Sequence, residues 1–247
     1  LAYSRKVEDM TSANLEAYGH FFRGERLIDQ LQFEDAKEEF AAAIALDSTF
    51  GLAYYRLAYA VSWSEGKEEL SVRLIAKAMS LLDRIPPKEQ YLVRAVHAQI
   101  NLGFQAGVAV LREMEKTYPD DKEMIYNIGD WSYHAGDYAV AEEYLARTLA
   151  MDSSNTRAIQ HLAWTYRELG NHERFLELSR IFVRRNPSSE SYKLLAQAYG
   201  TVGRAREGIA FLRRHLSRYP ERQYVRGALV DLYTYCDEYD SAFAIVA

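Results

Sequence analysis

Residues 122–155 read KEMIYNIGDWSYHAGDYAVAEEYLARTLAMDSSN, and this stretch decides the fold of the chain. It holds two segments patterned as amphipathic helices, separated by Gly136 and Asp137. A related pattern recurs along the chain about every 34 residues. A two-helix unit of that length cannot bury its apolar face alone, so neighbouring units must stack and share a core. The sequence therefore predicts an array of helix pairs.

Outward from this stretch, seven such units are predicted to fill residues 17–247. Residues 1–16 are expected to be the end of a helix that arrives from an upstream region, and Ser12 or Asn14 is expected to cap the next helix. The predicted units are 17–50, 51–87, 88–121, 122–155, 156–188, 189–222 and 223–247, of which the last is truncated. Because the chain begins with Leu1 and ends in an apolar helical pattern, we expect it to be part of a longer protein.

Small residues and prolines mark where the helices begin, end and cross. Three glycines, Gly136, Gly170 and Gly203, are expected to end first helices, because a left-handed residue costs little strain at glycine. Gly24 is expected where two helix backbones cross closely. The second helix of unit 51–87 is expected to run to Ile85, where the two following prolines stop it and start the next helix.

The overall composition excludes several classes of protein. Apolar residues make up 49% of the chain and charged residues 26%, which is typical of an ordinary water-soluble protein. The single Cys236 excludes an internal disulfide framework, so stability must come from stacking. A net charge of −5 gives no general reason to expect nucleic acid as a partner. We expect the cytoplasm as the compartment, with the periplasm as the alternative.

The first helices of successive units are expected to line a concave face. Their inward positions carry many aromatic side chains, which offer a large contact area at a low entropy cost. The predicted groove residues are Phe21, Tyr55, Tyr59, Tyr126, Asp130, Tyr133, Trp164 and Arg167. The sequence therefore predicts a groove for a peptide or protein segment. The alternative is that these side chains pack against neighbouring helices.

Positive charge is concentrated in the second half of the chain. Residues 174–226 hold twelve Lys and Arg against four Asp and Glu, a local net charge of +8. Four arginines are expected on outward positions of second helices, and together they form a predicted basic ridge: Arg180, Arg184, Arg213 and Arg218. The ridge would suit an acidic protein domain, whereas nucleic acid is not favoured because no stacking aromatic pattern accompanies it. The alternative is a solvated face with local ion pairs.

The motifs of catalysis and of cofactor binding are missing from the sequence. His172 and Glu173 begin a zinc-protease pattern, but its second histidine is absent. A glycine-rich phosphate loop and a nucleophile elbow are also absent. We therefore predict a non-catalytic chain that takes no metal and no cofactor.

The segments GDYAVAEEYLARTLAMD (136–152) and FEDAKEEFAAAIALD (33–47) resemble tetratricopeptide repeats. The resemblance implies an all-α fold, a right-handed superhelical α-solenoid of about seven helix-turn-helix units, and a function as a protein-protein interaction scaffold. Phe175 departs from the pattern, which has alanine there. Phe21 and Glu25 stand where the co-chaperones of this family carry the Lys and Asn of a carboxylate clamp. Recognition of a chaperone C-terminus is therefore not expected.

Three further segments are similar to the helical sensor module of large bacterial signalling proteins: SANLEAYGHFFRGERL (12–27), FGLAYYRLAYA (50–60) and RIPPKEQYLVRA (84–95). This resemblance implies an alternative function, in which the chain is the regulatory arm of a kinase, a nucleotide cyclase or a DNA-binding regulator. Its partner would then be a domain of the same protein that precedes Leu1.

Overall fold

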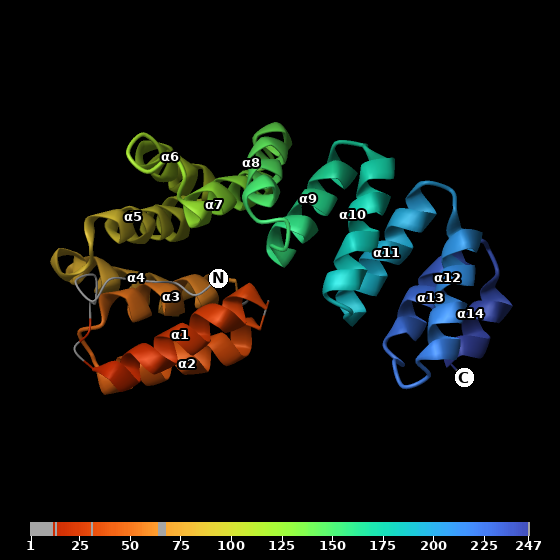
Figure 1. The fold of residues 1–247 in the computed structure, drawn as a ribbon, viewed down its shortest axis with the longest axis horizontal. Coiled ribbons are helices and arrows are strands. Elements are labelled where there is room, and N and C mark those ends of the chain that lie inside the picture. The colour runs from red at the N-terminus through yellow and green to blue at the C-terminus, as the bar shows by residue number, and fades with distance from the viewer. Residues whose placement is uncertain (1–11, 13, 31, 64–67, 247) are drawn as a thin grey trace. The chain divides into compact units, whose positions relative to one another are not determined.

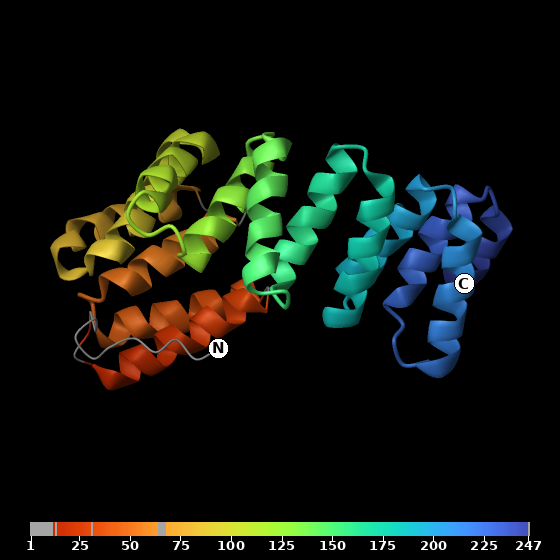
Figure 2. The same cartoon turned by 45° about the horizontal axis from the view of Figure 1, so that its top comes forward.

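The computed structural model describes residues 12, 14–30, 32–63 and 68–246, and every regular element in these ranges is a helix (Figure 1; Figure 2). The predicted all-α helical repeat is thereby confirmed. Most of the predicted incoming helix, residues 1–11 and 13, lies outside the described residues. The chain forms two compact units that divide after Val140, here called unit 1 and unit 2.

Unit 1 contains three helix pairs and the helix that follows them. Within each pair the two helices pack against each other, and each second helix contacts the first helix of the next pair. The helices of unit 1 are α1 (Leu15–Asp29), α2 (Phe33–Leu46), α3 (Gly51–Ser62), α4 (Glu68–Ser80), α5 (Pro87–Leu102), α6 (Phe104–Glu115) and α7 (Lys122–His134).

Unit 2 continues the alternation of first and second helices. Helix α9 packs against α10, which contacts α11, and α13 packs against α11, α12 and α14. The remaining helices are α8 (Tyr138–Met151), α9 (Thr156–Glu168), α10 (His172–Arg185), α11 (Ser189–Thr201), α12 (Ala205–Arg218), α13 (Val225–Tyr235) and α14 (Tyr239–Val246). The exact limits of the seven predicted repeat units stay a prediction.

Side-chain caps fix where several first helices begin. Asn14 caps α1, as predicted, by accepting hydrogen bonds from the backbone amides of Glu16 and Ala17 at 3.0 and 3.1 Å. Ser12, the other candidate cap, instead donates to the carboxylate of Asp47 at 2.5 Å and so ties the start of α1 to the end of α2. Such caps satisfy amides that have no partner inside the helix.

The predicted glycine turns are confirmed. Gly136, Gly170 and Gly203 follow α7, α9 and α11 with φ angles of +81°, +72° and +70°. In the last pair the equivalent residue is Asp237, which adopts φ +57° although it is not glycine. This one turn therefore carries strain that the other three avoid.

Close helix crossings depend on the absence of a Cβ atom. A methyl group at Gly24 would lie 2.5 Å from the Phe40 ring, and one at Gly107 would lie 2.7 Å from the Trp131 ring. Both rings are fully buried. The glycine at position 107 thus makes room for the large side chain of Trp131.

The second helix of the second pair differs from the prediction that it runs to Ile85. Helix α4 ends at Ser80, and a short 3-10 turn, η2 (Leu82–Arg84), leads to Ile85. The tighter turn lets the chain reverse before the prolines, and Pro87 then begins α5, as predicted. None of the described helices is both long and apolar enough to cross a membrane.

Candidate functional site

The predicted groove residues of unit 1 lie on first helices, but most are closed to solvent. Phe21 (α1), Tyr55 and Tyr59 (α3), and Tyr126 and Asp130 (α7) are each at most 4% exposed. In this structure they form part of the core of unit 1. Contact between these five side chains and a partner stays a prediction.

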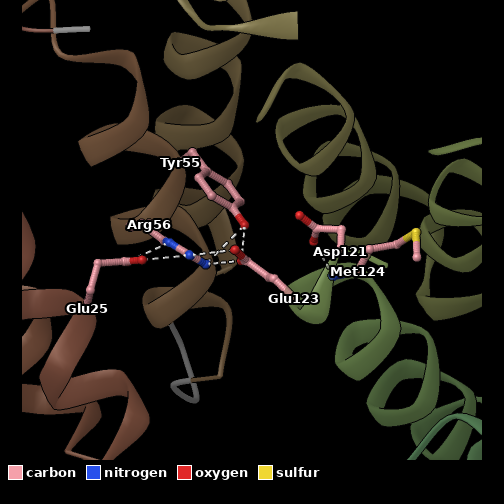
Figure 3. A network of polar contacts seen from close by, with 6 residues as sticks. All are labelled: Glu25, Tyr55, Arg56, Asp121, Glu123 and Met124. Atoms are coloured by element: carbon pink, nitrogen blue, oxygen red, sulfur yellow. Dashed lines mark hydrogen bonds and ion pairs between the residues drawn. The ribbon is translucent and has the colours of Figure 1, made fainter. Parts of the chain in front are cut away.

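The buried Tyr55 takes part in a polar network that was not predicted from the sequence (Figure 3). Arg56, 9% exposed, lies between two carboxylates from distant parts of the chain. Its Nη2 atom donates to Glu25 Oε2 at 2.8 Å and to Glu123 Oε2 at 2.9 Å. The Tyr55 hydroxyl donates to Glu123 Oε1 at 2.9 Å and accepts from Arg56 Nη1 at 3.0 Å. The network therefore ties α1, α3 and α7 together.

Local structure places Glu123 within reach of Arg56. Asp121 caps α7 by accepting from the backbone amide of Met124 at 2.9 Å, and Glu123 lies in the first turn of that helix (Figure 3). A carboxylate is favoured there by the helix dipole. Asp121 also accepts from Lys88 Nζ at 2.9 Å, which links the start of α5 to the start of α7.

The electrostatics of the network keep Arg56 charged and Tyr55 neutral. Burial alone would lower the pKa of Arg56, but Glu123 and Glu25 outweigh it and hold that pKa well above its usual range. Burial raises the pKa of Tyr55 well above its usual range, and Glu123 adds to this. The hydroxyl thus stays a hydrogen-bond donor at any physiological pH.

The accessible part of the predicted groove in unit 1 is an aromatic cluster near the end of α7. Trp63 stacks on Phe104 with ring centroids 5.7 Å apart, and His134 stacks on Phe104 at 5.0 Å. Tyr133, a predicted groove residue, lies edge-on to His134 at 5.2 Å. Trp63, Phe104 and Tyr133 are half-buried, and His134 is more exposed. These four side chains therefore keep part of their surface exposed to solvent.

In unit 2 the two predicted groove residues lie on α9. Trp164 is half-buried and packs edge-on against His161, with ring centroids 4.9 Å apart. The Arg167 guanidinium is paired with the neighbouring Glu168 at 2.7 Å. Each is accessible in part, so both keep their place among the candidate contact residues.

The four arginines of the predicted ridge are not equivalent. Arg180 pairs with Glu207 at 2.7 Å and donates to the Tyr199 hydroxyl at 3.1 Å. Arg213 is exposed but lies over the Tyr233 ring, 5.4 Å from its centroid. Arg184 and Arg218 are exposed, and neither forms an ion pair with another described residue. Arg180 is thus held by an ion pair and a hydrogen bond within unit 2, whereas Arg213 makes only a ring contact.

Sequence signals could have pointed to the missed residue. Arg56 is the one charged residue in the apolar segment GLAYYRLAYAVS, residues 51–62. An isolated charge in an otherwise buried helix must find partners, because an unpaired buried charge is costly. The partners themselves, Glu25 and Glu123, lie 31 and 67 residues away in sequence. No spacing rule for short motifs connects them.

No family model matches the chain, and no curated protein matches it in sequence. Solved structures do match. PilW, described as a widely conserved type IV pilus biogenesis factor, has 17% identity and a TM-score of 0.59, with 88% of this chain and 100% of that chain covered. The APC/C hetero-tetramer Cut9-Hcn1 has 14% identity and a TM-score of 0.58, with 91% and 44% covered.

A third similar structure is MamA from Desulfovibrio magneticus RS-1, at 18% identity and a TM-score of 0.54, which covers 64% of this chain and 90% of that chain. At such identities the likeness is informative about the fold and not about partners or activity. It confirms the prediction that the chain folds as a helical repeat of the tetratricopeptide type.

Proposed function

We propose that the chain is a non-catalytic scaffold that binds a peptide or protein segment through aromatic side chains on and beside its first helices. The observation that carries the proposal is the accessible aromatic cluster of unit 1, formed by Trp63, Phe104, Tyr133 and His134. Aromatic faces held in place by neighbouring rings bind without much loss of side-chain entropy. In unit 2, Trp164 and Arg167 would contribute contacts of the same kind.

The buried network supports this proposal by making the first helices rigid. Arg56, Glu25 and Glu123 fix three helices of unit 1 to one another. A surface that is already in its bound shape avoids the ordering cost of association. In the alternative, a regulatory arm, the partner would be a domain of the same protein, and the same side chains would make the contact.

A selection from a phage-displayed peptide library tests the proposal. Peptides enriched on the wild-type chain are measured again on Tyr133→Ala and on the double variant Trp164→Ala/Arg167→Ala. Removing one aromatic anchor is expected to weaken binding about fivefold or more. The matched control is Tyr118→Ala, because Tyr118 is also half-buried and packs on one ring, that of Tyr91 at 6.2 Å. Peptides that bind all four proteins equally would refute the proposal.

A further inference from the structure

Unit 2 carries a row of exposed arginines at one end of its helices. Arg184 and Arg185 lie in the last turn of α10, Arg214 and Arg218 lie toward the end of α12, and Arg226 lies in the first turn of α13. All five side chains are exposed. We call these five residues the basic edge.

Contacts between loops show that these helix ends belong to one edge of unit 2. The Tyr224 hydroxyl, in the loop after α12, donates to the backbone oxygen of Pro187, in the loop after α10, at 3.2 Å. The Tyr192 hydroxyl of α11 is 2.9 Å from His215 Nε2 of α12. Figure 1 and Figure 2 both show the ends of α10 and α12 on the same side of unit 2.

The basic edge is not neutralised by unit 2 itself. None of its five arginines forms an ion pair with any other residue that the structure describes. Two carboxylates occur on the neighbouring loops and helix starts. Glu190 accepts from the Gln160 amide at 2.7 Å, and Glu221 lies 3.8 Å from Arg222 Nε. Neither carboxylate forms an ion pair with any of the five arginines, so these five guanidinium groups keep their charge unpaired.

Helix dipoles explain only part of this arrangement. Cations at the ends of α10 and α12 interact favourably with the carbonyl ends of those helices. Arg226, however, lies in the first turn of α13, where a positive charge is unfavourable. Five like charges on one edge also repel one another. The arrangement therefore lacks a complementary charge that a partner would supply.

Beside the arginines of α12 lies an open depression of about 780 Å³. Its walls combine the guanidinium groups of Arg214 and Arg218 with the half-buried rings of Phe211 and Tyr219. His215 also lines it, and burial together with Arg222 lowers the pKa of this histidine, which favours its neutral form. Charge and apolar area thus occur side by side in one place.

We propose that the basic edge binds an acidic peptide segment, with carboxylates on Arg214 and Arg218 and an apolar side chain against the row of rings formed by Phe211, His215 and Tyr219. Arginine suits this role because its guanidinium group binds carboxylates through two parallel hydrogen bonds. The surface is made by the ends of two second helices, α10 and α12, and by the start of the first helix α13. It shares no residue with the aromatic side chains to which the proposed function refers.

A peptide fits this edge better than nucleic acid does. Residues 141–247 hold fifteen Lys and Arg against thirteen Asp and Glu, a net charge of only +2, within a chain of net charge −5. Nucleic-acid-binding domains are usually far more basic. The apolar walls of the depression would add nothing to the binding of a small inorganic anion.

The test is fluorescence anisotropy with a labelled ten-residue peptide of Asp and Glu that contains one Leu. Two variants of the full chain change the net charge equally. Arg218→Glu lies on the basic edge, whereas Arg206→Glu lies at the opposite end of the same helix, exposed and 3.9 Å from Glu238. We expect Arg218→Glu to weaken binding about tenfold and Arg206→Glu to change it less than about twofold. A rise in NaCl from 50 to 300 mM should also weaken binding.

Two further probes and the comparison of the two variants distinguish the proposal from its rivals. The same peptide with Gln and Asn in place of the acids should bind at least about tenfold more weakly. A single-stranded oligonucleotide that binds more tightly than the acidic peptide would overturn the proposal. Equal losses in the two charge-reversal variants, with helical circular dichroism unchanged, would also overturn it, because general electrostatics would then account for binding.

Discussion

Unit 1 and unit 2 use their charged residues in opposite ways. Residues 1–140 hold fifteen Lys and Arg against twenty-two Asp and Glu, a net charge of −7, yet the central contact of unit 1 is a buried arginine between two glutamates. Residues 141–247 have a net charge of +2, and five arginines stand unpaired on one edge. One repeat architecture thus uses arginine inside to fix helix positions and outside to present charge.

The largest expected effect is at the buried arginine of unit 1. Arg56→Met would leave Glu25 and Glu123 facing each other without a cation, and we expect the free energy of unfolding to fall by about 3 kcal/mol. Urea denaturation in a Trp164→Phe background would measure it, because the remaining Trp63 and Trp131 both report on unit 1.

Two controls separate loss of the network from loss of one charge. Arg73→Met removes an exposed arginine that is 3.7 Å from Glu69, and its expected cost is below about 0.5 kcal/mol. Adding Glu25→Gln and Glu123→Gln to Arg56→Met should recover part of the loss, because no unpaired charge remains. If Arg56→Met and Arg73→Met cost the same, the network does not hold unit 1 together.

The two units also differ in the space around a glycine within a helix, which is closed at Gly107 in unit 1 and open at Gly227 in unit 2. Gly107→Ala in unit 1 would place a methyl group 2.7 Å from the buried Trp131 ring, so we expect a loss of about 1–2 kcal/mol despite the better helix propensity of alanine. Gly227→Ala in α13 of unit 2 meets no atom within 4 Å, so propensity alone should act and stabilise by about 0.5–1 kcal/mol. Thermal unfolding followed by circular dichroism would show shifts of opposite sign. Two shifts of the same sign would contradict this packing.

The two units should also respond to acid at different pH values. The pKa of His215 in unit 2 lies below its usual 6.5, because of burial and then Arg222, with Glu221 opposing. A histidine with a lowered folded-state pKa stabilises the fold above pH 6.5, and this contribution is lost as pH falls from 6.5 through the folded-state pKa. Hydrogen exchange, corrected for intrinsic rates, should therefore show unit 2 loosening between pH 7.5 and 5.5. His215→Gln should abolish that change.

In unit 1 the carboxylate of Glu39 has a pKa below its usual value. Burial raises the pKa of Glu39, but hydrogen bonds from Arg23 and His20 outweigh it and leave that pKa below 4.5. A carboxylate with a lowered folded-state pKa contributes stability above its unfolded-state pKa, and this contribution is lost as pH falls through the folded-state value. Unit 1 should thus keep this contribution at pH 5.5. Loosening of unit 1 before unit 2 would contradict the comparison.

Much of the fold could be predicted from local patterns. Gly136 and Gly170 ended first helices as predicted, and Asn14 capped α1, because turns and caps depend on nearby residues. The predicted end of α4, at Ile85, was wrong by five residues. The helix ends at Ser80, and a 3-10 turn lies between it and the two prolines. Local chemistry thus predicts where most helices lie.

Less of the candidate site than of the fold could be predicted from the sequence. Position along a first helix predicts groove-facing side chains for Tyr55 and Tyr126, but both are buried, and this burial depends on which side chains from distant helices meet them. The partners of Arg56 come from residues 25 and 123, and only the folded chain brings them together. For the predicted basic ridge, counting charges shows that residues 174–226 are rich in arginine, but it cannot show which arginines are paired locally, as Arg180 is with Glu207.

The smallest expected effect is at the strained turn of the last helix pair. Asp237 adopts φ +57°, where the equivalent turns have glycine, so Asp237→Gly should relieve backbone strain. Its side chain accepts from the Tyr239 hydroxyl at 3.0 Å, and loss of this exposed hydrogen bond offsets part of the gain. We expect a net stabilisation of unit 2 of about 0.5 kcal/mol, and a loss for Asp237→Ala, which keeps the strain without the hydrogen bond. Urea denaturation followed by Trp164 fluorescence measures both, and equal stability of the two variants would mean that the left-handed conformation costs nothing here.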